Sequence, residues 1–104
     1  MNSIKVLTKI TRNYKLCNDF LTSQYIFNLK HNYKLSNGYI HSNMYLTQDN
    51  KHIISISEWD HINNLHGWLT SDIKKNFDTD FKDLIYKQDN EILYNYNEDE
   101  TFLL

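Results

Sequence analysis

The chain has 104 residues, which is room for one domain with a single hydrophobic core. Its 11 Lys and Arg against 13 Asp and Glu give a net charge of −2, without the basic excess of a nucleic-acid-binding module, and its 14% aromatic content argues against disorder. The single cysteine, Cys17, cannot form an internal disulfide, and no segment is long and apolar enough for a signal peptide or a membrane span. We therefore expect one soluble, cytoplasmic domain over residues 1–104, with no nucleic-acid partner and no membrane partner.

The first third of the chain predicts a strand followed by a helix. Residues 3–11 alternate between apolar and polar side chains, and this period of two is typical of a strand. After Asn13, a suitable N-cap, the period changes to that of a helix, which we place at residues 14–29. The apolar stripe of this helix would consist of Leu16, Cys17, Phe20, Leu21 and Phe27.

The middle of the chain predicts two strands joined by a hairpin. Residues 39–47 and residues 52–59 both alternate, and the polar residues 48–51 suit a tight turn, so the two strands should be antiparallel neighbours. On the first of these strands, one face would carry Ile40, Met44 and Leu46. The other face would carry Tyr39, His41, Asn43 and Tyr45.

Helical segments and a last strand complete the predicted order. Asp60 would cap a helix whose buried face includes Trp68. Ser71 would cap a short helical segment that runs through Phe77. We expect a further helical segment at residues 80–87, a break at residues 88–90 and a strand at residues 92–96. The resulting order, β-α-β-β-α-β, is the ferredoxin-like α+β arrangement. Because both sheet faces carry apolar residues and the helices cover one of them, we expect a homodimer whose two sheets pack face to face.

Three stretches of the sequence form a recognisable pattern. Gly38 opens the second predicted strand, and Ser57-Glu58-Trp59-Asp60 ends the third. Nine residues after Trp59 comes the run Trp68-Leu69-Thr70-Ser71-Asp72, with Phe77 after it. This pattern resembles that of the antibiotic-biosynthesis-monooxygenase superfamily, whose members are dimeric α+β barrels. The resemblance extends over nearly the whole chain in the order of its elements.

One branch of this superfamily consists of small monooxygenases that oxidise aromatic polyketides to quinones without metal or flavin. There the deprotonated substrate itself reduces dioxygen, so the protein must bind an aromatic molecule, hold its phenolate form and exclude water. The resemblance thus implies a small cofactor-independent monooxygenase-like enzyme that acts on an aromatic small molecule. Trp59, Trp68 and Tyr45 are the candidate substrate-binding residues. His41 and Asn43 are the candidate catalytic residues if the second strand turns that face toward the helices.

A haem-degrading branch of the superfamily provides an alternative. That branch uses an asparagine early in the first strand, a tryptophan against the porphyrin and a histidine that binds the iron. Trp68 matches the tryptophan, but the position ten residues beyond it is Asp78, and residues 4–6 include no asparagine. Haem binding or breakdown would lack the usual histidine ligand, unless His41 or His66 is presented differently, so we expect no cofactor and keep haem as an alternative.

A third interpretation is a non-catalytic dimeric ligand-binding or regulatory module that keeps the barrel without the chemistry. The candidate side chains also have a structural interpretation, Trp59 and Trp68 as core residues and His41 as a hydrogen-bonded surface residue. A filled cleft with no room for an aromatic ring would favour the module. A deep pocket lined by Trp68 and one histidine would favour the enzyme.

Overall fold

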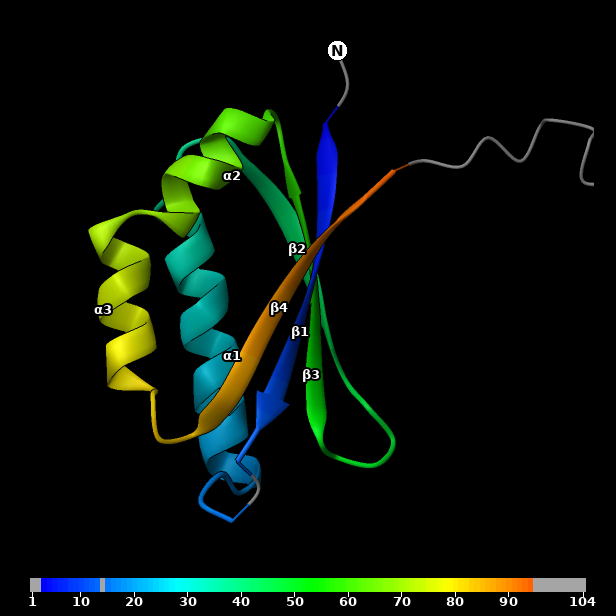
Figure 1. Ribbon diagram of the computed structural model, residues 1–104, viewed down its shortest axis with the longest axis vertical. Coiled ribbons are helices and arrows are strands. Elements are labelled where there is room, and N and C mark those ends of the chain that lie inside the picture. The colour runs from blue at the N-terminus through cyan, green and yellow to red at the C-terminus, as the bar shows by residue number, and fades with distance from the viewer. Residues whose placement is uncertain (1–2, 14, 95–104) are drawn as a thin grey trace, which may run out of the picture.

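Four antiparallel strands form one sheet, and the helices lie against one of its faces (Figure 1). The structure is a computed structural model that describes residues 3–13 and 15–94. Along these residues the elements are β1 (Ile4–Arg12), α1 (Asp19–Lys34), β2 (Tyr39–Leu46), β3 (His52–Trp59), α2 (Ile62–Leu69), α3 (Asp72–Asp80) and β4 (Ile85–Leu93). The strand order is β2-β3-β1-β4, which confirms the predicted ferredoxin-like α+β fold. None of these helices is long and apolar enough to cross a membrane.

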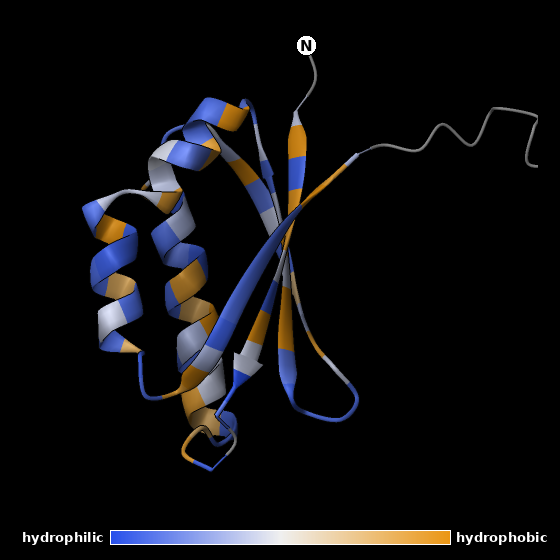
Figure 2. Cartoon of the chain, in the orientation of Figure 1, coloured by the Kyte–Doolittle hydropathy of each residue, from blue (hydrophilic) through white to orange (hydrophobic). Residues whose placement is uncertain are grey.

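The two central strands, β1 and β3, supply the sheet's part of the core. They pair with Ile4 opposite Trp59 and Ile10 opposite Ile53, and the side chains of Ile10, Ile53 and Trp59 are completely buried beneath the helices. Alternate residues point to the other face, and the alternation of apolar and polar positions is visible along the strands in Figure 2. The sequence prediction for β3, residues 52–59, matches the observed strand.

Helix α1 begins later than the sequence predicted. Its N-cap is Asn18, whose side chain accepts a hydrogen bond from the backbone N–H of Leu21 at 2.9 Å, so the predicted start at residue 14 with Asn13 as the cap was wrong. Asn13 instead holds a turn, because its carbonyl accepts the backbone N–H of Cys17 at 2.8 Å. The helix then continues to Lys34, five residues beyond the predicted end.

The buried face of α1 is also different from the predicted apolar stripe. Phe20 and Phe27 are 68% and 73% exposed. The residues of α1 that are buried are Thr22, Tyr25, Leu29, Asn32 and Tyr33. For Tyr33 the reason is the sheet, which presents hydroxyl groups toward the helices, since the Tyr33 hydroxyl forms a 2.7 Å hydrogen bond with the Ser55 hydroxyl. A helix that covers such a surface needs side chains with a polar end, because an unpaired buried hydroxyl is unfavourable.

Strand β4 occupies residues for which the sequence predicted a helix and a break. The predicted helix at residues 80–87 and the predicted break at residues 88–90 were wrong, since Ile85–Leu93 pairs with β1 along its length. The polar run within it is tolerated because β4 is an edge strand with an open side. Residues 95 and 96 of the predicted last strand lie outside the described residues. The cap of α2 also differs, since His61 rather than Asp60 is its N-cap.

Leu29 and Phe27 provide a test of the buried face of α1. Leu29→Ala should lower the free energy of unfolding by about 2–5 kcal/mol, because it opens a cavity in the core. Phe27→Ala should change the free energy of unfolding by less than about 0.5 kcal/mol, because the Phe27 ring is mostly exposed to solvent. Urea unfolding measures both, and equal losses in the two variants would contradict the assigned face.

Candidate active-site cleft

The two tryptophans that the sequence proposed as ligand-binding residues lie in the core. Trp59 and Trp68 are 0% and 5% exposed, and their ring centroids are 5.7 Å apart, with the Tyr33 ring against both. Their indole N–H groups are already bonded inside the protein. Trp59 Nε1 donates to the Ser57 hydroxyl at 2.9 Å, and Trp68 Nε1 donates to the Asn32 side-chain oxygen at 2.7 Å. Both rings therefore build the helix–sheet layer.

The other three proposed residues lie on the opposite face of the sheet. His41, Asn43 and Tyr45 pair with Glu58, Ile56 and Ile54, the β3 residues whose side chains point away from the helices. A bulge between Tyr39 and His41 sets this orientation, because it turns Tyr39 toward Trp59 while His41 faces outward. The structure thus does not bring His41, Asn43 and Tyr45 into one cleft with the two tryptophans.

His41 belongs to a polar cluster on this outer face. Its Nε2 lies 2.8 Å from Glu58 Oε1, and the Ser3 hydroxyl donates to the other oxygen of the same carboxylate. The Ser3 hydrogen bond and the positive charge that His41 can carry both lower the pKa of Glu58 below its ordinary value. Because the carboxylate stands between the serine and the histidine, His41 is not placed to activate the Ser3 hydroxyl as a base.

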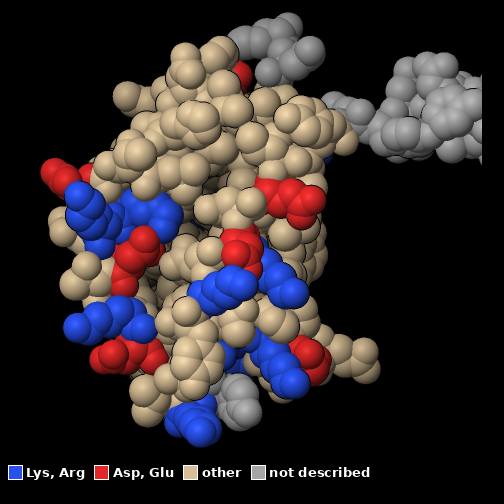
Figure 3. All heavy atoms as spheres, viewed as in Figure 1, with Lys and Arg blue, Asp and Glu red and all other residues tan. Residues whose placement is uncertain are grey.

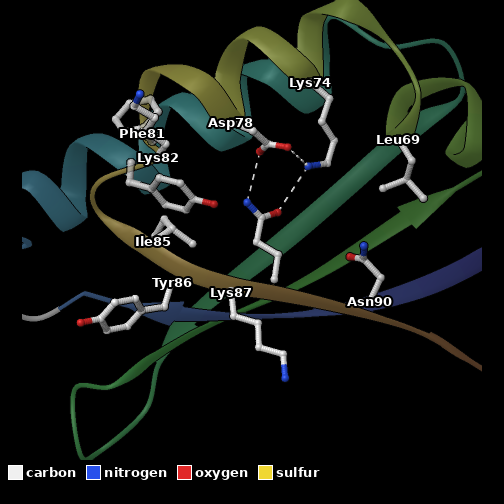
Figure 4. Close-up of a pocket in the computed structure, with 11 residues that line it drawn as sticks. Leu69, Lys74, Asp78, Phe81, Lys82, Ile85, Tyr86, Lys87 and Asn90 are labelled. Atoms are coloured by element: carbon white, nitrogen blue, oxygen red, sulfur yellow. Dashed lines mark hydrogen bonds and ion pairs between the residues drawn. The ribbon is translucent and has the colours of Figure 1, made fainter.

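A cleft lies between α3 and the edge strand β4 and has a volume of about 560 Å³ (Figure 4). One part of its wall is apolar or aromatic, and it consists of Tyr25, Leu69, Phe81, Ile85 and Tyr86. The other part is polar or charged, and it consists of Lys74, Asp78, Lys82, Lys87, Gln88 and Asn90. This volume leaves room for an aromatic ring system. Of the described residues, neither Trp68 nor any histidine lines this cleft.

A closed triangle of polar contacts crosses the cleft. Lys74 Nζ lies 2.6 Å from Asp78 Oδ2 and 3.4 Å from Gln88 Oε1, and Gln88 Nε2 donates to Asp78 Oδ1 at 3.1 Å. Figure 4 shows Lys74 and Asp78 extending from α3 toward β4. The two α3 residues share one helix face because they are four positions apart.

Lys74 is a buried cation. It is 8% exposed, and its ammonium group also lies 5.2 Å from the centroid of the Trp68 ring. Figure 3 shows acidic and basic side chains interspersed on the face that contains α3 and β4. No single sign dominates this face, so the charge that a ligand meets inside the cleft is set locally. Asp78 is more exposed than Lys74.

The residues present do not fit a haem bound in the way the haem-degrading branch binds it. Phe77 and Asp78 stand where that branch has its iron ligand, and Trp68 is only 5% exposed and packs against Tyr33 and Trp59. Over residues 3–13 and 15–94, no group of three or more His, Cys, Asp or Glu side chains is arranged to hold a metal ion.

The sequence did not predict the cleft residues, for two different reasons. The Lys74–Asp78 pair has helical spacing and could have been found as an i, i+4 ion pair on a helix capped by Ser71. Gln88 could not have been found from the sequence, because its contact with α3 exists only when residues 85–93 form a strand. Tyr25 carried no signal of its own.

Comparison with known proteins gives structural neighbours only. No family model and no curated protein matches the sequence. SnoaB, a cofactor-independent oxygenase from Streptomyces nogalater, superposes with a TM-score of 0.78 at 8% identity, over 93% of this chain and 96% of SnoaB. Rv0793 from Mycobacterium tuberculosis superposes with a TM-score of 0.73 at 10% identity, over 95% of this chain and 100% of Rv0793. A protein of Nitrosomonas europaea named a "Putative antibiotic biosynthesis monooxygenase" superposes with a TM-score of 0.68 at 6% identity, over 92% of both chains.

These neighbours confirm at the level of fold the resemblance that the sequence indicated. The chain has the ferredoxin-like α+β fold of the antibiotic-biosynthesis-monooxygenase-like proteins. At these identities the likeness concerns the fold, and the chemistry has to be argued from this chain's own side chains.

Ser3→Ala tests the electrostatics of the outer face. The substitution should raise the pKa of Glu58 toward its ordinary value, because the Ser3 hydroxyl stabilises the charged carboxylate. Since the pKa of Glu58 is lower in the folded than in the unfolded state, its contribution to stability is present above the unfolded pKa and is lost as the pH falls through the folded pKa. An NMR titration of the Glu58 carboxyl carbon measures the shift, with Ser23→Ala as the control. An unchanged titration would disprove the Ser3 contact.

Proposed function

We propose that the protein is a monooxygenase-like enzyme that oxidises an aromatic small molecule in the cleft between α3 and β4, without metal or flavin. The observation that carries the proposal is the combination, in one cleft, of an aromatic wall with the buried ammonium group of Lys74. The fold shared with a cofactor-independent oxygenase supports it.

The reaction requires the phenolate form of the substrate. For a phenol with a free para position, one atom of dioxygen becomes the new quinone oxygen and the other leaves as water with the two hydrogens lost from the ring carbon and the hydroxyl. The four electrons that reduce dioxygen come from the aromatic ring. The protein then has to favour the phenolate, orient the ring and limit the access of water.

The side chains of the cleft can divide these tasks. The Lys74 ammonium lies in a largely water-excluded position, where a positive charge stabilises a nearby phenolate most strongly. Asp78, bonded to Lys74 at 2.6 Å and partly exposed, can receive the phenol proton and pass it to water. Phe81 and Tyr86 provide aromatic surface against which the ring can stack.

We also propose that the protein acts as a homodimer joined through the outer face of the sheet. On this face Leu7 lies opposite Ile56, and Tyr45 lies opposite Ile54, so four large apolar side chains adjoin where no described helix covers them. Tyr45 is 53% exposed in the single chain. A second copy packed on this face would remove these side chains from water.

Lys74→Met tests the proposed role of the ammonium group, because methionine keeps the unbranched stem and removes the charge. With 1-naphthol as the test phenol, oxygen uptake should fall by roughly 10²–10³-fold. Absorption spectra should show bound phenolate with the wild type and bound neutral phenol with the variant. Lys75→Met, on the same helix but outside the cleft, should behave as wild type.

The outcomes separate the candidate functions. Phenolate binding without oxygen uptake by the wild type would assign the cleft to the non-catalytic binding module. A Lys74→Met protein that still takes up oxygen at the wild-type rate would refute the role of Lys74.

Ile56→Glu tests the proposed dimer. Light scattering at low micromolar concentration should give twice the mass of one chain for the wild type and the mass of a single chain for the variant, because a buried unpaired carboxylate opposes association. Asn28→Glu, on the exposed side of α1, serves as the control. A wild-type protein with the mass of one chain would refute the dimer.

A further inference from the structure

The hydroxyl group of Tyr25 is buried without a hydrogen-bond partner. Tyr25 is 0% exposed, and among the residues that the structure describes no group bonds to its Oη. Burial, with smaller contributions from Tyr33, Asp78 and Cys17, raises the pKa of Tyr25 above its ordinary value. The group therefore stays protonated at physiological pH and remains a hydrogen-bond donor.

The ring of Tyr25 is held firmly in place. Its centroid lies 5.2 Å from that of Phe77 and 5.3 Å from that of Phe81, with the second pair edge to face. Tyr33, two helical turns further along the same face of α1, is equally buried, but its hydroxyl is bonded to Ser55 at 2.7 Å. One α1 tyrosine is thus satisfied by the sheet, while the other lines the cleft between α3 and β4.

A phenylalanine would fill the same space without an unpaired hydroxyl. The unpaired donor therefore fits a group that arrives with a ligand. Because no hydrogen bond joins Tyr25 to the triangle of Lys74, Asp78 and Gln88, the cleft has two separate points at which a ligand oxygen can be bound.

We propose that Tyr25 is a specificity residue that donates a hydrogen bond to a carbonyl oxygen of the aromatic ligand while Lys74 binds its phenolate oxygen. The inference rests on the proposed function and narrows the ligand to phenols that carry a second, carbonyl oxygen. A site with a buried donor discriminates against ligands that lack the matching acceptor, because the donor is then left unpaired.

The test compares two probes of nearly the same size, 4-hydroxybenzophenone and 4-benzylphenol, which differ by a carbonyl against a methylene group. Calorimetric titration measures the affinity of each for the wild type and for Tyr25→Phe. The affinity ratio of ketone to methylene probe should fall roughly tenfold in the variant. The carbonyl also makes the phenol more acidic, but this effect is common to both proteins and cancels when the two ratios are compared.

Thermal unfolding of the unliganded variants adds a readout that a purely structural role would not give. Tyr25→Phe should raise the melting temperature, because it removes an unpaired buried hydroxyl. Tyr33→Phe, the matched control, should lower it, because it leaves the buried Ser55 hydroxyl unpaired.

Each outcome decides between the two proposals. If both probes bind and the affinity ratio of ketone to methylene probe is the same in wild type and Tyr25→Phe, the role of Tyr25 is refuted and the proposed function stands. If neither probe binds the wild type, both proposals fail. A lower melting temperature for Tyr25→Phe would assign the hydroxyl a structural role and would also refute the inference.

Discussion

The hydroxyl groups on the helix-facing side of the sheet are the constraint on which the rest of the structure depends. Ser55 and Ser57 are completely buried at the centre of β3, so the layer above them has to carry polar groups as well as apolar surface. Tyr33 of α1 and the indole of Trp59, at the end of β3 itself, supply these groups through hydrogen bonds to the two serines. Once their polar ends are used in this way, the aromatic residues at the centre of the layer are fixed in the core and are not free to bind a ligand.

The polar groups that remain available to a ligand lie at the edge of the sheet. At β4 the sheet contributes polar side chains with an open side, and Gln88 meets Lys74 and Asp78 of α3 across the cleft. Near the same edge, no group among residues 3–13 and 15–94 forms a hydrogen bond with the Tyr25 hydroxyl. A buried cation and a buried neutral donor beside an aromatic wall form a site suited to an aromatic molecule with oxygen substituents. The proposed chemistry would therefore take place at the edge of the sheet.

The sequence predicted the parts of the fold in which side-chain periodicity and burial agree. β1 and β3 have one buried face with a strict period of two, and both were found. α1 was misjudged because its buried positions include the polar residues Thr22 and Asn32, whose partners Cys17 and Trp68 are brought to them only by folding. β4 was missed because its pairing with β1 outweighs the low strand propensity of Gln88, Asp89 and Asn90. The cleft was not predicted for the same reason, since a cleft between α3 and β4 cannot be foreseen when residues 80–87 are assigned to a helix. The bulge in β2, which turns His41 away from the helices, left no trace in the alternation of residues either.

The proposed function requires that an aromatic ligand binds between α3 and β4. The most direct measurement is a titration of isotope-labelled protein with 1-naphthol, followed by the amide chemical shifts in NMR spectra. The largest chemical-shift changes should occur around the cleft, at Lys74, Asp78, Gln88 and Asn90. Changes centred on His41, Asn43 and Tyr45 on the outer face of the sheet, or no changes at saturating 1-naphthol, would contradict it.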